Sequence, residues 1–152
     1  PANADVGDHA ITLRVTDADG LSDSQSFTIR VANVNDAPSF TTTGVVTALV
    51  DVRYTYEVVT EDPDLIHGDA LTVTASTLPG WLELVDHGDG TATLSGTPFN
   101  EDVDLGNYRV MLEVRDRAGA LDTQTFTIEV KLPGGGAEVD HRLFLPMVVR
   151  NY

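Results

Sequence analysis

A segment of this chain occurs twice, and the spacing of the two copies restricts the folds that the chain can adopt. Residues 20–31 align without gaps with residues 119–130, so that Gly119 lies 99 positions after Gly20. The Gly, Asp, Gln, Phe, Thr, Ile and Val positions of the two segments are identical. A period near 100 residues has the size of a whole domain and is much longer than the unit of a solenoid. The sequence therefore predicts tandem domains of one kind.

Both copies show the side-chain alternation of β-strands. Residues 8–17 alternate between two sets of side chains, one of them mostly apolar, and residues 27–31 alternate again after a turn at residues 17–20. A period of two is typical of a half-buried strand. Residues 40–130 contain about seven such short segments separated by turn residues, of which the first is residues 40–51 and the second is the alternating segment 54–58, and no segment has the period of a helix. We therefore predict an all-β, Greek-key β-sandwich of the Ig-like kind.

The two copies differ in completeness. Residues 1–35 supply only the last two strands of such a sandwich, as a C-terminal hairpin, whereas residues 36–132 supply a complete one. A lone hairpin is marginally stable in water. We therefore expect either that a longer protein contains this chain or that another chain completes the first unit. Residues 133–152 are predicted to form a Gly-rich linker and a hydrophobic C-terminal strand.

The end of the chain contains its most hydrophobic run, which predicts an assembly strand. An apolar strand of this kind promotes aggregation unless it is covered. One hypothesis is that the strand completes the open hairpin of a neighbouring copy, which would build a fibre because a head-to-tail contact does not close. The alternatives are a strand packed on its own domain and a processing tail. The residues assigned to this strand are Leu143, Leu145, Met147 and Val149.

Charge and composition exclude several classes of protein. The formal net charge is −15, from 24 acidic and 9 basic residues, which argues against nucleic acid and anionic membranes as partners. No stretch approaches the ~18 apolar residues of a membrane-spanning helix. The charge suits a divalent cation or a cationic partner, although solubility alone would also favour it. The chain has no cysteine, so a metal ion, packing or partner chains must supply the stabilisation that disulfides give other small secreted domains.

Several short motifs together resemble the cadherin family. Residues 33–38, with Phe40 following, are similar to the cadherin linker pattern D-x-N-D-N-x-P-x-F, and residues 61–64 are similar to its acidic D-x-D segment. Residues 78–82 (L-P-G-W-L) and 94–98 (L-S-G-T-P) resemble signatures of dystroglycan-type cadherin repeats of bacterial proteins. The resemblance covers roughly residues 1–131 and implies a tandem cadherin-like, Ig-like repeat.

The resemblance also implies a calcium site at the junction of two repeats. Ca²⁺ prefers six to eight oxygen ligands from carboxylates, amides, carbonyls and water. The linker begins with Asn33 instead of Asp and is one residue shorter than the family pattern, so we expect at most one site, with a Kd near ~10⁻⁴–10⁻³ M. The alternative is an Asx-rich turn that binds no metal. The implied ligands are Asn35, Asp36, Asp62, Asp64 and Asp116.

The sequence contains no recognisable catalytic constellation. The four histidines are scattered, no nucleophile motif is present, and the Glu61–Asp62 pair lies in the segment where calcium is expected. We therefore expect a non-catalytic structural or adhesion module of a secreted or cell-surface protein, whose partners are other copies, neighbouring repeats, or a surface glycan or protein. The alternative is an accessory carbohydrate-binding domain of a secreted enzyme. In that case Trp81 would be a sugar platform, whereas its position after Leu-Pro-Gly favours a core residue.

Overall fold

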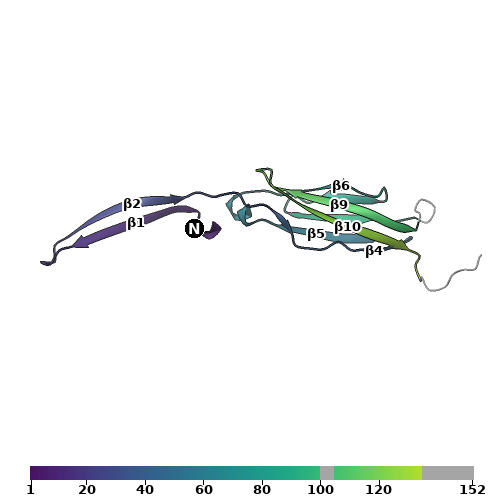
Figure 1. The fold of residues 1–152 in the computed structure, drawn as a ribbon, viewed down its shortest axis with the longest axis horizontal. Helices are drawn as coiled ribbons and strands as arrows, with labels where there is room; N and C mark the ends of the chain where they lie inside the picture. The colour runs from purple at the N-terminus through teal and green to yellow at the C-terminus, as the bar shows by residue number, and fades with distance from the viewer. Residues whose placement is uncertain (100–104, 135–152) are drawn as a thin grey trace, which may run out of the picture.

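The computed structural model describes residues 1–99 and 105–134. The molecule is elongated: a two-stranded ribbon extends along the long axis from one end of a β-sandwich (Figure 1). The described residues contain ten strands and two short 3₁₀ turns. The predicted all-β fold class is therefore confirmed.

The ribbon is the hairpin of β1 (Gly7–Thr16) and β2 (Ser22–Val31). Its strands pair antiparallel along their whole length, from Gly7 opposite Val31 to Thr16 opposite Ser22. In the turn, Oδ1 of Asp17 accepts hydrogen bonds from the backbone N–H groups of Asp19 and Leu21. Gly20 has a φ of +85°, which glycine adopts without steric cost. The Asp-x-x-Gly sequence thus determines where the chain reverses.

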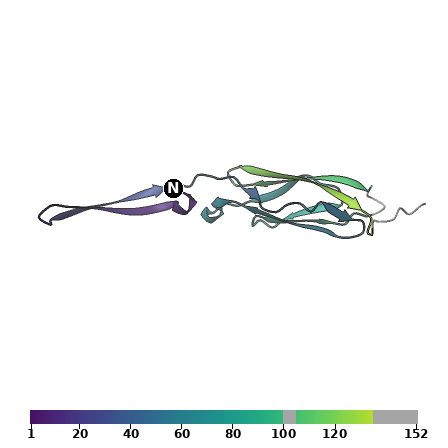
Figure 2. The same ribbon diagram turned by 60° about the horizontal axis from the view of Figure 1, so that its bottom comes forward.

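The sandwich consists of two four-stranded sheets, which Figure 2 shows as two layers. One sheet has the order β4-β10-β9-β6, and the other has the order β3-β5-β8-β7. All neighbouring strands pair antiparallel except β4 and β10, which are parallel. The strands are β3 (Ser39–Phe40), β4 (Thr47–Leu49), β5 (Tyr54–Glu61), β6 (Thr72–Thr77), β7 (Leu82–Asp86), β8 (Thr91–Gly96), β9 (Gly106–Arg115) and β10 (Leu121–Lys131).

The core lies between the two sheets and follows from the alternation in the sequence. Along β5, buried and exposed residues alternate strictly. Val58 and Leu94 from one sheet meet Leu112 and Ile128 from the other, and all four are fully buried. Burial of each such side chain stabilises the fold by about 1.5–3 kcal/mol relative to its exposure.

Trp81 is partly buried and packs against this core, in agreement with its place after Leu-Pro-Gly. Its ring packs edge to face against Tyr54 and Tyr108, with centroid distances of 5.9 and 6.1 Å. The backbone of Trp81 also lies against Gly96, where any Cβ atom would collide with the Trp81 carbonyl. Pairs of rings in this geometry add about 0.5–1.5 kcal/mol beyond their area burial. Trp81 therefore links β5 and β9 through its two ring contacts.

The structure differs from the sequence prediction at the first strand of the sandwich. Residues 40–51 were expected to form one strand region, but they are divided between β3 in one sheet and β4 in the other. Between these strands, Gly44 lies against the ring of Phe126, so that the chain passes close to β10. The described helical segments are the 3₁₀ turns η1 (Asn3–Asp5) and η2 (Pro63–His67). Within the described part of the chain, no helix is long and apolar enough to cross a membrane.

Candidate functional site

Asp62 directly follows β5, where the sequence changes from strand to turn. Pro63 follows it, as is common at the first position of a helical turn, and η2 begins there. Oδ1 of Asp62 accepts a hydrogen bond of 2.7 Å from the backbone N–H of Asp64 and so caps the turn. Gly68, with a φ of +90°, ends it. The Asp-Pro-Asp sequence thus directs the Asp62 side chain towards the junction of hairpin and sandwich.

Two further aspartates approach Asp62 from other loops. Asp116 follows β9, and its Oδ1 accepts hydrogen bonds from the backbone N–H groups of Gly119 and Ala120. Asp69 lies between η2 and β6, and its Oδ1 accepts from the backbone N–H groups of Ala70 and Arg117. Oδ1 of Asp116 thus stabilises its own turn, whereas Oδ1 of Asp69 also joins its loop to the loop after β9. In both residues the second oxygen is left for other contacts.

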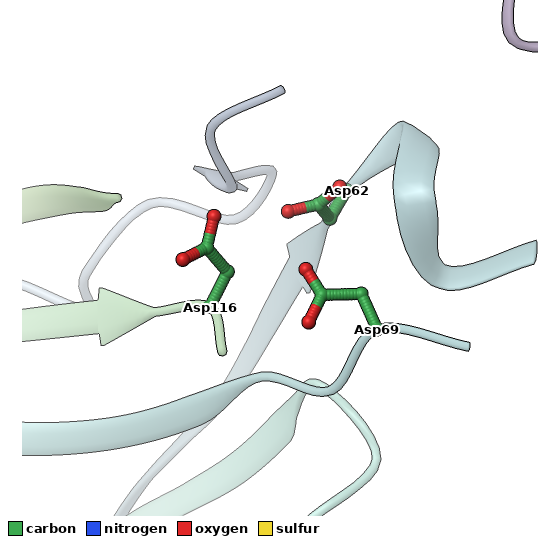
Figure 3. Close-up of side chains that lie close together, drawn as sticks. All are labelled: Asp62, Asp69 and Asp116. Atoms are coloured by element: carbon green, nitrogen blue, oxygen red, sulfur yellow. The ribbon is translucent and has the colours of Figure 1, made fainter. Parts of the chain in front are cut away.

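The three carboxylates form a compact cluster. Each of Asp62, Asp69 and Asp116 offers one oxygen that lies within 4.8 Å of the other two. Figure 3 shows the three side chains pointing towards one another. Asp62 is only 6% exposed. Oδ2 of Asp62 and Oδ2 of Asp69 are buried and have no hydrogen-bond partner in the described part of the protein. Such unpaired buried oxygens are costly unless a cation or a proton compensates them.

The linker between hairpin and sandwich joins the cluster from the other side. The side-chain nitrogen of Asn35 donates a 2.8 Å hydrogen bond to Oδ2 of Asp116. The backbone N–H of Asp36 donates to Oδ2 of Asp64, at 2.6 Å. The side-chain nitrogen of Asn3 donates to both Asp36 and Asp64, at 3.0 and 3.1 Å. Asn3 precedes β1, so this amide connects the hairpin unit directly to the sandwich.

The electrostatic environment differs between the carboxylates. Burial raises the pKa of Asp62 above its ordinary value of 3.8, and the negative charges of Asp64, Asp69 and Asp116 raise it further. The hydrogen bond from Asn35 lowers the pKa of Asp116, and the backbone N–H groups of its own turn act in the same direction. Among the described residues no cationic side chain forms an ion pair with these carboxylates, although the guanidinium of Arg117 donates a 3.2 Å hydrogen bond to the carbonyl of Gly68, the residue before Asp69.

This donor set has the chemistry of a site for a hard divalent cation. The candidate ligand atoms of the cluster are all carboxylate oxygens, and no histidine or cysteine is among them. Ca²⁺ and Mg²⁺ both bind oxygen, but Ca²⁺ accepts irregular geometry and more protein ligands, which suits donors from three loops. A cation between Asp62, Asp69 and Asp116 would neutralise charges that otherwise repel one another.

The structure brings the five predicted ligands into one region, although their metal-binding role remains a prediction. Asp62 and Asp116 belong to the carboxylate cluster, whereas Asp64 and Asp36 are hydrogen-bonded to each other and to Asn3. Asn35 contacts the cluster through Asp116.

The sequence analysis missed Asp69 because it considered only the motif at residues 61–64. The signal available was a further acidic residue in the same loop, immediately after Gly68 and before the next strand. The predicted assembly strand, residues 143–149, lies outside the described residues.

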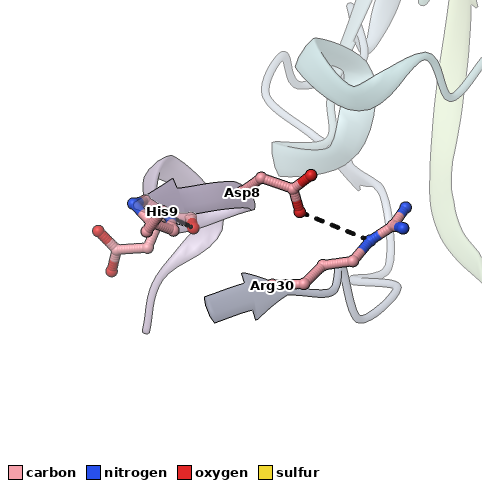
Figure 4. Close-up of polar contacts among 4 residues, drawn as sticks. Asp8, His9 and Arg30 are labelled. Atoms are coloured by element: carbon pink, nitrogen blue, oxygen red, sulfur yellow. Dashed lines mark hydrogen bonds and ion pairs between the residues drawn. The ribbon is translucent and has the colours of Figure 1, made fainter. Parts of the chain in front are cut away.

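The base of the hairpin carries charged and polar contacts that are exposed to solvent and lie apart from the acidic cluster. At the base of the hairpin, Nε of Arg30 lies 3.9 Å from Oδ1 of Asp8, and both side chains are exposed (Figure 4). Nearby, Nε2 of His9 contacts the backbone carbonyl oxygen of Asp5 at 2.6 Å. An exposed ion pair of this kind contributes about 0–1 kcal/mol. These contacts hold the start of β1 and do not form a site.

The fold and the position of the acidic loops define an Ig-like, cadherin-like β-sandwich module. The chain belongs to the family described as "Putative Ig domain", which its sequence matches over residues 37–131. The matched segment begins at Ala37 and extends to the end of β10, so it covers both sheets of the sandwich. Among curated proteins, none matches the sequence significantly.

Solved structures with the same fold belong to several kinds of protein. The endo-fucoidan hydrolase MfFcnA4 from glycoside hydrolase family 107 is 27% identical over 88% of this chain, with a TM-score of 0.54, but this chain spans only 20% of that one. The SrpA adhesin from Streptococcus sanguinis is 18% identical over 68% of this chain and 61% of its own, with a TM-score of 0.55. The protocadherin gammaB7 EC3-6 structure is 17% identical over 87% of this chain and 33% of its own, with a TM-score of 0.63.

Proposed function

We propose that this chain is a non-catalytic extracellular structural module of the adhesion type, whose joint between hairpin and sandwich is made rigid by Ca²⁺. The observation that carries the proposal is the convergence of Asp62, Asp69 and Asp116 with two buried, unpaired oxygens. From the linker, the side-chain nitrogen of Asn35 and the backbone N–H of Asp36 donate hydrogen bonds to Asp116 and Asp64, so the linker is part of the same network. Because the linker and Asn3 are hydrogen-bonded to the acidic residues of the sandwich, an ion bound by these residues would fix the angle between the two units.

The experiment is a calcium titration of the purified chain in chelated buffer, followed by isothermal calorimetry and by thermal unfolding. Occupancy at a hundredfold excess over Kd stabilises the folded state by about 2.7 kcal/mol. For a domain of about 100 residues this corresponds to a rise in Tm of about 10–20 °C. Asp62→Asn should abolish the rise, whereas Asp19→Asn, an exposed aspartate of the hairpin turn, should preserve it. A wild-type Tm that is equal in chelator and in calcium would refute the proposal.

The similarity to a hydrolase supports a second candidate, an accessory carbohydrate-binding domain of a secreted enzyme. The 27% identity to an endo-fucoidan hydrolase extends over 88% of this chain, which spans a fifth of that enzyme. A shallow groove of about 380 Å³ lies beside β7 and β8, and its lining includes Arg53, Trp81, Glu83 and Ser95. A glycan screen separates the candidates: saturable binding that Arg53→Ala removes, with an unchanged calcium response, would favour the carbohydrate-binding role.

The open face of the hairpin supports an assembly role. Leu13, Phe27 and Ile29 are all exposed, although their pattern is that of core residues. Fibre formation by donation of the strand at residues 143–149 remains a prediction. Deletion of residues 137–152 tests it: if the shortened chain sediments as the full chain does at every concentration, this strand has no role in assembly.

A further inference from the structure

The hairpin β1–β2 and the strands β9–β10 have the same register. Ile11 pairs with Phe27 in the hairpin, and Val110 pairs with Phe126 in the sandwich, each position shifted by 99. The strand bounds agree in the same way: β1 spans Gly7–Thr16 and β9 spans Gly106–Arg115. The sequence repeat is therefore also a repeat of backbone pairing, and the sandwich shows what the hairpin is built to contact.

The apolar face of the hairpin repeats the core face of β9–β10. In the sandwich, Leu112 and Ile128 are fully buried against the opposite sheet. Their equivalents in the hairpin, Leu13 and Ile29, are 54% and 48% exposed. The same face carries Phe27, the equivalent of Phe126, which is 42% exposed. Exposed apolar surface of this extent marks a surface that another structure covers.

Polar residues on the hairpin repeat the contacts by which β10 holds the rest of its sandwich. The side-chain oxygen of Gln124 accepts a 2.9 Å hydrogen bond from the hydroxyl of Tyr56, and its nitrogen donates to the carbonyl of Thr42. Oδ2 of Asp122 accepts a hydrogen bond from the backbone N–H of Phe40. The hairpin has the identical residues, Gln25 and Asp23, at the equivalent positions, and both are exposed.

The aromatic contacts specify the occupant further. The ring of Phe126 packs edge to face on Tyr56, at a centroid distance of 5.7 Å, and lies directly against Gly44. A structure that covers Phe27 in the same way needs a tyrosine on its inner face and a glycine where the chain passes the ring. Both outer edges also need partners, since β4 pairs with β10 and β6 pairs with β9 in the sandwich. One added strand would satisfy a single edge and would leave most of the face in water.

We infer that the hairpin β1–β2 is the docking surface for a half-sandwich of the same kind as residues 39–97, joined to it in the same polypeptide through Pro1, as residues 39–97 are joined to β9 through Pro98. Pro1, Asn3, Asp5 and Val6 match Pro98, Asn100, Asp102 and Val103 when a two-residue insertion at 104–105 is allowed for, and this match supports the connection. The inference concerns the hairpin face and does not rest on calcium. It goes beyond the proposed function because it identifies the partner of a surface remote from the acidic cluster.

The test extends the full chain with a second copy of its own residues 33–97, placed directly before Pro1, in chelated buffer. Hydrogen exchange followed by NMR or mass spectrometry is compared between the extended and the original chain. The amides of β1 and β2 should exchange at least about a hundredfold more slowly in the extended chain, and the binding of a hydrophobic dye to the hairpin should disappear. Unchanged exchange in β1 and β2 would overturn the inference.

Matched variants locate the contact. In the extended chain, Phe27→Asp should remove the protection, whereas Thr28→Asp, on the opposite face of the same strand, should preserve it. Equal effects of the two substitutions would also overturn the inference. A third outcome is protection that rises with concentration in the original chain, which would mean that a second copy covers the face and would likewise overturn the proposed connection.

Discussion

Asn35 donates a hydrogen bond to Asp116 across 81 positions of sequence, at 2.8 Å. One partner is in the linker and the other follows β9, so this single contact joins the entry of the sandwich to the start of its last turn. It is also the principal reason why the pKa of Asp116 is lowered. The contact therefore links the position of the linker to the charge of the acidic cluster.

The first prediction concerns this pair. Asn35→Ala removes the donor, so the pKa of Asp116 should rise towards its ordinary value of 3.8. A carboxyl group whose pKa is lowered by folding stabilises the folded state at pH values above its unfolded-state pKa. This stabilisation is lost as the pH falls through the folded-state pKa. The variant should consequently have a lower Tm than the wild type at neutral pH, and the difference should shrink in acid. NMR titration of Asp116 with and without the substitution measures the change in pKa, and thermal unfolding at several pH values measures the difference in Tm. An unchanged titration would contradict the role given to Asn35.

The second prediction concerns the pH dependence of the cation-free protein. The pKa of Asp62 is raised by folding, so Asp62 contributes fully to the stability of the folded state below pH 3.8. This contribution is lost as the pH rises through the folded-state pKa. In chelator, acidification from neutral pH towards about pH 4 should therefore raise the stability of the wild type relative to Asp62→Asn. Unfolding by urea at several pH values measures this difference. A difference between the two proteins that is constant with pH would show that Asp62 is not perturbed.

Calcium should reverse that dependence. The ion binds deprotonated carboxylates, so its stabilising effect should weaken as the pH falls. The same urea series in saturating calcium is the comparison. If calcium stabilises the protein equally at neutral pH and near pH 4, the ion does not bind these carboxylates.

The third prediction concerns Asp69, the member of the cluster that no motif indicated. Asp69→Asn removes one of three converging charges, so the cation-free protein should become more stable while the affinity for calcium falls by about tenfold or more, equivalent to about 1.4 kcal/mol. The free energy of unfolding measured in chelator should thus rise, whereas the calcium affinity measured by calorimetry should fall. A loss of stability under both conditions would indicate that Asp69 acts only through its hydrogen bonds to Ala70 and Arg117.

The fourth prediction concerns the amide that joins the two units. Asn3→Ala removes the donor that both Asp36 and Asp64 share, so the hairpin should reorient more freely relative to the sandwich. NMR relaxation and small-angle scattering in chelator should show separate tumbling of the two units. Asn3→Asp places a third carboxylate beside this pair, so its effect should depend more strongly on calcium. If the two units of Asn3→Ala tumble as one, the amide does not determine their orientation.

The fifth prediction concerns the packing of Trp81. In Gly96→Ala the added Cβ would meet the backbone of Trp81, which cannot move without displacing β7, so the variant should lose about 1–3 kcal/mol of stability. Gly80→Ala is the matched control, since a Cβ there meets nothing. Chemical unfolding of both variants measures the difference. Equal stability of the two would mean that this contact has no energetic role.

Local sequence was sufficient to predict those features that depend on neighbouring residues. The alternation in residues 8–17 and 54–58 predicted strands, and the structure has β1 and β5 there. The packing of Trp81 against the core was indicated by the turn before it. The division of residues 40–51 between two sheets depends instead on the close approach of Gly44 to Phe126, 82 positions later, which no local pattern reports.

The acidic cluster was predictable only in part, for a similar reason. Asp62 belongs to the acidic segment at residues 61–64, and Asp116 stands in an Asp-x-x-Gly turn that ends at Gly119, so the resemblance indicated both. Asp69 belongs to no motif, and its place in the cluster depends on the path of the chain after η2, where the positive φ of Gly68 redirects it. The exposure of Leu13 and Ile29 was likewise invisible to the alternation, because a strand pattern predicts a buried face without indicating what buries it.

The parallel pairing of β4 with β10 determines how the sandwich would respond to mechanical tension. Thr47–Leu49 and Glu129–Lys131 run side by side in the same direction, and hydrogen bonds from Glu129 to Val46 and from Val50 to Lys131 extend the contact. The chain enters the sandwich at β3, reaches β4 a few residues later, and leaves the sandwich after β10. A pull on the two ends therefore slides these strands along each other, so that their hydrogen bonds must break together in shear. Strands loaded at one end would instead unzip one bond at a time.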